Sequence, residues 1–190
     1  PLPAAARQLR PAAERRWAVA GAACLTGAGD TPAGLEALAA GRSCRGLTPD
    51  AALTEHLPPG IFRRMKRLSR MSLELSAAAL AAAGPQAPGA VFMGTGWGAL
   101  SETHDFIEKL YASNELFTSP IDFVGSVHNA PAGQVAIRYG ATGPNLTLTG
   151  GDASFEQALL AANLLAPEGL ESLLLIAADE YHDMFSRLFD

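Results

Sequence analysis

An aspartate occupies the position in this chain where a catalytic side chain would be expected. Asp152 directly follows Gly150 and Gly151, after a short stretch of alternating polar and apolar residues and before a long apolar run. This order predicts a strand, a tight glycine turn and a helix. A residue at such a turn lies at the positive end of the helix dipole, which favours nucleophiles and other anionic groups. Here the group is a carboxylate.

The helix predicted over 152–166 is apolar almost all the way round. Its large side chains are Phe155, Leu159, Leu160, Leu164 and Leu165, with alanines between them. A helix without a polar face is buried on all sides, and one of about 15 residues is too short to span a bilayer. We therefore expect a buried central helix, which a chain of 190 residues can barely surround without a second chain or domain.

The rest of the chain predicts an alternation of strands and helices. Apolar strands are expected at 17–23, 90–93, 145–149 and 172–178, helices at about 31–40, 61–83, 101–112 and 126–139, and loops at 42–60 and 113–125. This order is typical of an α/β fold with a mostly parallel, mixed sheet covered by helices. Residues 1–16, rich in Pro, Ala and Arg, predict an extended or mobile lead-in to one domain over 17–190.

The composition limits the class of protein. Charged residues make up 17% of the chain, below the typical value of about 25%, which burial against a partner and an alanine-rich bias explain equally well. A net charge of −5 argues against nucleic acid as the main partner. The chain has no apolar run long enough for a membrane span, and residues 1–13 contain arginines but not the apolar segment of a signal peptide. We expect a cytoplasmic protein without a membrane partner.

No cofactor or metal is expected. Residues 94–98 form a glycine-rich segment that lacks the Lys-Ser/Thr pair of a phosphate loop, and they predict a tight turn after a strand. A polar cluster at 179–183 follows the last strand, where sites of α/β proteins usually lie, but adjacent side chains diverge in direction. Cys24 and Cys44 form neither a CxxC pair nor a disulfide framework.

Five segments, in the same order along the chain, resemble the β-ketoacyl synthase family of the thiolase superfamily. They are residues 19–43, 67–71, 92–96, 127–137 and 143–158. Each segment alone is a weak signal, whereas their order is specific. The resemblance implies the N-terminal half of a thiolase-like fold, with 143–158 as the segment that carries the nucleophilic cysteine in the family.

Two departures from the family bear on activity. Asp152 stands where the family has its cysteine, and a carboxylate cannot carry an acyl group as a thioester. The two catalytic histidines of the family belong to its C-terminal half, and His56, His104, His128 and His182 match neither of them. The resemblance thus implies the scaffold of an acyltransferase family without its condensation chemistry, and we expect no catalytic residue.

The resemblance also implies a function. Silent members of the family, called chain-length factors, pair with an active ketosynthase and help to shape its acyl tunnel. We therefore expect an inactive subunit in a heterodimer with a full-length ketosynthase, in fatty-acid, polyketide or aryl-polyene-type biosynthesis, with acyl carrier protein as a further candidate partner. Two alternatives stay open: an N-terminal fragment of a larger synthase-like protein, and a self-associating homodimer that binds acyl chains or carrier proteins.

Within this resemblance, several residues are candidates for the tunnel or the subunit interface. Phe155 is the candidate gate for chain length and Phe123 a second candidate for the tunnel wall, with core packing as the alternative for both. His128 and Asn129 are candidates for a helix cap or an interface pair. The remaining candidates lie on the strand that forms the dimer interface in the family: Asn145, Thr147 and Thr149.

Three roles remain open for Asp152. It closes off the nucleophile position near the end of a tunnel, or it is a helix N-terminal carboxylate satisfied by backbone N–H groups, and these two roles are compatible. The third role is a base that decarboxylates a malonyl unit, for which the sequence offers no oxyanion partner.

Overall fold

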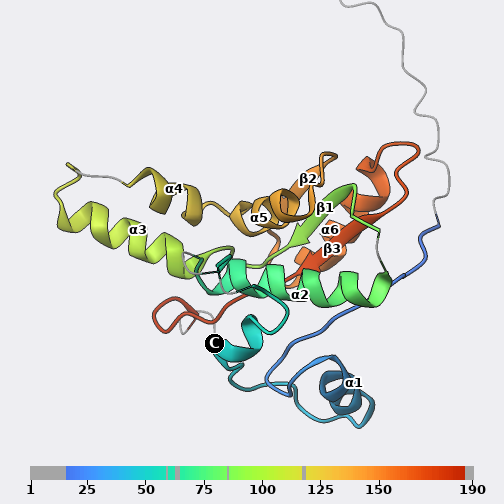
Figure 1. Ribbon diagram of the computed structural model, residues 1–190. Helices are drawn as coiled ribbons and strands as arrows, with labels where there is room; N and C mark the ends of the chain where they lie inside the picture. The colour runs from blue at the N-terminus through green and yellow to red at the C-terminus, as the bar shows by residue number, and fades with distance from the viewer. Residues whose placement is uncertain (1–15, 59, 63–64, 85, 117–118, 187–190) are drawn as a thin grey trace, which may run out of the picture.

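Three parallel strands form the centre of the protein (Figure 1). The computed structural model describes residues 16–58, 60–62, 65–84, 86–116 and 119–186, so the predicted lead-in lies outside the described residues except for residue 16. The strands lie in the order β2-β1-β3. Their bounds are β1 Ala90–Gly94, β2 Asn145–Leu148 and β3 Leu173–Ala177.

The register of the sheet confirms the predicted parallel arrangement. Val91 of β1 pairs with Asn145 of β2, and Ala90 pairs with Leu173 of β3. All five residues of β1 are buried, as expected for the central strand of a covered parallel sheet. Both described pairings are parallel, and β2 and β3 are the edges of the sheet.

Helices α2 (Arg67–Ala83) and α5 (Ala130–Tyr139) cover one face of the sheet. Leu73 of α2 and Val135 of α5 are fully buried in the same cluster as Val91 of β1. Both helices begin later than the sequence predicted. The backbone of residue 66 and of residue 127 is extended, so neither α2 nor α5 can include the residues before these positions.

On the opposite face, α6 (Ser154–Leu165) packs on the sheet with small residues. Ala158 and Ala162 are buried, and a Cβ added at Gly94 of β1 would lie 2.4 Å from the carbonyl oxygen of Ser154. The outer side of α6 is exposed. The prediction of a helix buried on all sides is therefore wrong for this chain alone, because α6 packs against the sheet and leaves its large side chains exposed.

Helices α3 (Leu100–Ala112) and α4 (Pro120–Ser126) extend to one side of the sheet (Figure 1). Helix α4 lies in the segment that we predicted as a loop, and that prediction is wrong. The start signal is present in the sequence, because Pro120 takes the first helical position and the hydroxyl of Ser119 accepts a hydrogen bond from the N–H of Asp122 at 3.2 Å.

The segment before α1 (Thr31–Ala39) is not a strand, contrary to the prediction for 17–23. Its only β-type pairing within the described residues is a bridge between Thr26 and Gly29. Val19 is 85% exposed, so this apolar segment does not lie against an edge strand of the sheet. Without a neighbouring strand, its backbone groups form no β-ladder. Asp30 caps α1, since its carboxylate accepts a hydrogen bond from the N–H of Ala33 at 3.2 Å.

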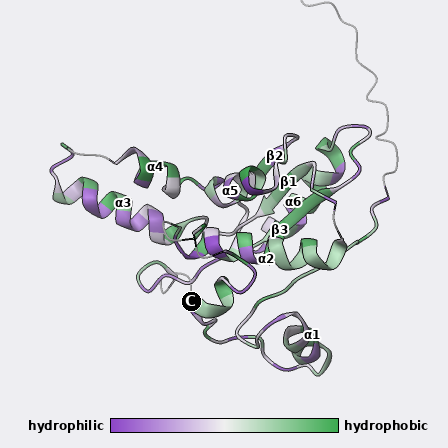
Figure 2. Ribbon diagram, in the orientation of Figure 1, coloured by the Kyte–Doolittle hydropathy of each residue, from purple (hydrophilic) through white to green (hydrophobic). Residues whose placement is uncertain are grey.

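The loop predicted at 42–60 contains one short 3-10 helix, η1 (Asp50–Leu53). Figure 2 shows the apolar character of β3 and the mixed character of α3. Among the helices of the described residues, none combines the length and the hydropathy that crossing a bilayer requires.

Candidate functional site

The carboxyl ends of all three parallel strands lie side by side at one end of the sheet. The N–H of Thr95, after β1, donates to the carbonyl of Leu148 at 3.0 Å, and the N–H of Ala178, after β3, donates to the carbonyl of Gly94 at 3.2 Å. The loop after β1, the turn after β2 and the segment after β3 are therefore neighbours. This end of the sheet is where parallel sheets place their functional groups.

Asp179 organises the glycine-rich loop after β1. Its carboxylate accepts hydrogen bonds from the hydroxyl of Thr95 at 2.7 Å and from the backbone N–H groups of Gly96 and Trp97 at 2.8 and 3.2 Å. The hydroxyl of Thr95 in turn accepts from the N–H of Gly98 at 3.0 Å. The donors that would hold a phosphate are used by a carboxylate of the chain itself, which supports the interpretation of a tight turn.

Glu180, the next residue, has a different partner. Its carboxylate accepts from the backbone N–H of Ser101 at 2.7 Å and from the Ser101 hydroxyl at 2.9 Å. Adjacent carboxylates thus point to different segments, as we predicted for this cluster, and each holds the start of the chain after β1 to the end of β3.

Asp152 lies on η2 (Gly151–Ala153), a turn of 3-10 helix between β2 and α6, and is exposed. Neither η2 nor α6 has a capping hydrogen bond from a side chain, and the N-cap position of α6 is Ala153. The interpretation of Asp152 as a carboxylate that caps the helix is therefore wrong. The helix begins two residues later than the sequence predicted, which moves Asp152 off its first turn.

Ser154 fixes the turn instead. Its hydroxyl accepts from the N–H of Gly150 at 2.9 Å and lies 2.9 Å from the carbonyl oxygen of Thr95 and 2.6 Å from that of Gly151. Either carbonyl can accept the single hydroxyl proton. Ser154 is 4% exposed, and it joins the turn after β2 to the loop after β1.

The two candidate phenylalanines lie on different helices. Phe155, on the first turn of α6, is 44% exposed, and Phe123, on α4, is 54% exposed with its ring centroid 5.8 Å from that of Phe106. Neither is a buried core residue, so the core-packing alternative is wrong for both. Their role in a tunnel stays a prediction.

His128 lies against the glycine loop. A Cβ at Gly98, whose φ is +70°, would lie 2.2 Å from the His128 ring, so only glycine leaves room for this contact. Asn129 occupies the N-cap position of α5 without a capping hydrogen bond from its side chain. The cap interpretation is therefore wrong for Asn129, and the interface interpretation of both residues stays a prediction.

Asn145 and Thr147 lie on β2, which is an edge strand of the sheet, and Thr149 directly follows it. Asn145 donates from Nδ2 to the carbonyl of Ala132 in α5 at 3.2 Å, and Thr149 is exposed. The Asn145 Oδ1 and Thr147 Oγ1 atoms are buried and have no hydrogen-bond partner within the described ranges. Two polar atoms of this edge strand are thus left unsatisfied by the described part of the chain.

The residues that sequence reasoning missed are those joined across the fold. Thr95 and Asp179 are 84 positions apart in the chain, and so no local pattern links them. His104, Asp105 and Glu108 bring one potential ligand atom each within 4.8 Å of one another, but Asp105 is engaged by the Lys66 ammonium. We do not assign these three residues as metal ligands.

Comparison with known families identifies the scaffold. Residues 39–189 match the model of the β-ketoacyl synthase N-terminal domain. The chain belongs to this family. A search of curated proteins gives no match. The resemblance places the family's nucleophilic cysteine at the position of Asp152, which is exposed at the turn after β2, and this correspondence stays a prediction.

Two solved ketosynthase structures are similar to this chain. One is the ishigamide ketosynthase/chain length factor, with a TM-score of 0.69 and 24% identity over 85% of this chain and 52% of that chain. The other is the ketosynthase ApeO in complex with its chain length factor ApeC from Xenorhabdus doucetiae, with a TM-score of 0.54 and 25% identity over 75% of this chain and 57% of that chain. The chain spans little more than half the length of these ketosynthase-fold relatives. Their likeness confirms the predicted thiolase-like N-terminal half.

Proposed function

We propose that this chain is a catalytically inactive ketosynthase-like subunit of the chain-length-factor type. It pairs in the cytoplasm with an active β-ketoacyl-carrier-protein synthase that builds fatty-acid, polyketide or aryl-polyene-type chains. Residues 17–190 are its ketosynthase-like domain, and the acyl carrier protein that serves the synthase is a further partner. The observation that carries this proposal is the exposed outer side of α6.

Five large apolar side chains of α6 are exposed, most of them on the side away from the sheet. We call this surface the α6 outer face, formed by Phe155, Leu159, Leu160, Leu164 and Leu165, which are between 44% and 57% exposed. A monomer rarely leaves so many large apolar side chains together in water, and such a patch marks an interaction site. Burial of apolar surface gives about 25 cal/mol per Å², so a partner that covers this face stabilises the assembly substantially.

The open edge of β2 supports the same conclusion. An unpaired edge strand is a ready site for pairing with another chain. Asn145 and Thr147 each keep one buried side-chain atom without a partner in the part of the chain that the structure describes. Buried polar atoms are normally satisfied, so we assign these residues and Thr149 to the subunit interface.

The absence of a usable nucleophile supports the inactive role. Asp152 is exposed at the turn, and a carboxylate does not form the thioester on which ketosynthase condensation depends. We assign no catalytic residue and no cofactor. In this proposal Phe155, beside the turn, limits the length of the growing acyl chain, and Phe123, His128 and Asn129 belong to the surface that meets the synthase.

The two similar structures support a partner of this class, since one is a ketosynthase/chain length factor and the other is a ketosynthase in complex with its chain length factor. This chain spans 52% and 57% of those chains, which favours a second candidate function. In it, the remainder of a longer polypeptide, in place of a separate synthase, covers the α6 outer face. The intact mass of the natural gene product distinguishes these two candidates.

The test is co-purification from the native host, with native mass spectrometry of the product. We expect a one-to-one complex with a longer chain that has a nucleophilic cysteine and two catalytic histidines. Leu160→Asp on the α6 outer face should abolish this complex, whereas Leu47→Asp, at a residue 87% exposed on a distant loop, should leave it intact. A pure homodimer that binds acyl thioesters would overturn the proposal in favour of the self-associating alternative.

The gate is tested separately in the same complex. Phe155→Ala should lengthen the acyl products, because it opens space next to the turn after β2, whereas Phe106→Ala on α3 should leave their length unchanged. Products of unchanged length in the Phe155 variant remove the gate but leave the subunit assignment intact.

A further inference from the structure

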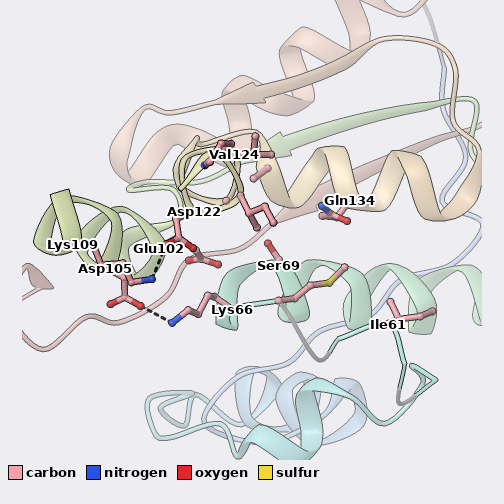
Figure 3. Close-up of a pocket in the computed structure, with 14 residues that line it drawn as sticks. Ile61, Lys66, Ser69, Glu102, Asp105, Lys109, Asp122, Val124 and Gln134 are labelled. Carbon is pink, nitrogen blue, oxygen red and sulfur yellow. Dashed lines mark hydrogen bonds and ion pairs between the residues drawn. The ribbon is translucent and has the colours of Figure 1, made fainter. Parts of the chain in front are cut away.

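A cavity of about 510 Å³ opens between α2, α3, α4 and α5, on the other side of the sheet from the α6 outer face (Figure 3). Its walls are partly apolar, from Ile61, Met65 and Val124, and partly polar, from Ser69 and Gln134. Small-molecule sites commonly have a volume of about 300–1,000 Å³ and this mixture of an apolar lining with a few polar groups.

One buried carboxyl group in the cavity wall has an unsatisfied oxygen. Glu102 of α3 is 8% exposed, and its Oε2 atom has no hydrogen-bond partner among the residues that the structure describes. Glu180 nearby is equally buried, but it accepts two hydrogen bonds from Ser101. Since buried polar atoms are almost always paired, the free oxygen of Glu102 indicates a missing ligand.

The charges around the cavity indicate the sign of that ligand. The Lys66 ammonium pairs with Asp105 at 2.5 Å, and the Lys109 ammonium pairs with Asp122 at 2.7 Å (Figure 3). Both lysines that line the cavity are thus neutralised by an aspartate that lines it too. Among the charged groups of the described residues that line the cavity, the charge left over is that of Glu102, which a cation would balance.

We propose that this cavity binds a small organic cation, an ammonium group on an aliphatic body, with the Glu102 carboxylate accepting hydrogen bonds from the ammonium. The aliphatic body lies against Ile61, Met65 and Val124. Ser69, which is 6% exposed, and Gln134 flank the ammonium and complete a polar end of the cavity.

Binding of the cation is coupled to deprotonation of Glu102. Burial, and after it the charge of Glu180, raise the pKa of Glu102 to about 7, while Lys66 opposes the rise and Asp105 adds to it. The other charged groups that line the cavity are Lys109 and Asp122, which form an ion pair. A cation binds the ionised form, so its affinity should increase as the pH rises through this range.

The test is calorimetric titration of the purified protein with hexylammonium chloride, with 1-hexanol and hexanoate as head-group controls. We expect hexylammonium to bind at least tenfold more tightly than 1-hexanol, and about tenfold more tightly at about pH 8 than at about pH 6. Glu102→Gln keeps the shape of the side chain and should remove both differences. Glu108→Gln is the matched control, because Glu108 is exposed on the same helix and does not line the cavity.

Three results would overturn the proposal. They are no saturable binding of hexylammonium at millimolar concentration, equal affinity for hexylammonium and 1-hexanol, and unchanged preference in the Glu102 variant. Circular dichroism and thermal melting of each variant check that it is folded. The titration uses this chain alone, so its outcome does not depend on whether the proposed synthase partner exists.

Discussion

The two faces of the sheet differ in how completely this chain covers them. On one face, α2 and α5 bury Leu73 and Val135 against β1. On the other, α6 buries only small residues, and its large side chains point outward, with Leu160 57% exposed. The helices α2 and α5 cover the first face of the sheet. On the second face, the outer side of α6 would need a further layer of protein to be buried. An apolar helix in the sequence shows that burial is required, but not which molecule supplies it.

Leu73→Ala tests the face of the sheet that α2 and α5 cover, and it should have the largest effect on stability. Leu73 is fully buried between α2 and the sheet, so its truncation leaves a cavity. We expect a loss of about 3–4 kcal/mol in the free energy of unfolding, measured by urea denaturation. A loss near zero would mean that Leu73 is not tightly packed between α2 and the sheet.

Glu102→Gln tests whether the side of α2 and α5 holds one unfavourable buried charge. The folded pKa of Glu102, about 7, lies above its ordinary value of 4.5, so the folded state binds the proton more tightly than the unfolded state does. Wild-type stability should therefore fall as the pH rises from about 4.5 through 7, by up to about 3 kcal/mol.

Glu102→Gln should remove that part of the decline, so that the variant is the more stable protein at about pH 8 and equal to the wild type at about pH 4. Urea midpoints measured across this pH range check the prediction. Parallel stability curves for the two proteins would contradict it.

Ser154→Ala tests the hydrogen bonds that connect the start of α6 to the turn after β2 and to the loop after β1. The Ser154 hydroxyl accepts from Gly150 and is within hydrogen-bond distance of the Thr95 carbonyl, which links α6 to the loop after β1. Its loss should cost about 1–2 kcal/mol of unfolding free energy. Hydrogen exchange should accelerate at the N–H of Gly150. Unchanged exchange there would show that the turn is held by other contacts.

Leu160→Ala tests the α6 outer face and should have the smallest effect on stability. Leu160 is more than half exposed, so its truncation in the isolated chain should change stability by less than about 0.5 kcal/mol. The pair of Leu→Ala variants compares the same change on the two faces. If Leu160→Ala costs as much as Leu73→Ala, this chain covers its own α6 by self-association.

The sequence predicted the three strands to within one residue at each end, because β1 and β3 are continuous apolar runs, as in buried parallel strands, and β2 alternates polar and apolar residues. It failed at 17–23, where the same apolar pattern has no sheet edge to join. It failed again at α4, where Ser119 and Pro120 carried a start signal that we did not use.

The candidate site was predicted in outline and not in its bonding. Local spacing placed Asp152 at the turn after β2. It could not show that Ser154 would fix that turn, nor that Asp179 would fill the glycine loop, because these contacts join strands distant in sequence. The position of Glu102 in a cavity wall depends on four helices at once, and no periodicity within α3 reveals it.

The small residues on the inner side of α6 also determine where this protein is free to change. At Ser154, Ala158 and Ala162 the helix lies so close to the sheet that a larger side chain would force it away, and Gly94 opposite is equally restricted. The large residues on the outer side carry no such restriction. Mutation can therefore alter what binds to α6 without altering how the chain folds, so that new binding specificities can evolve, or be selected in a library, on an unchanged scaffold.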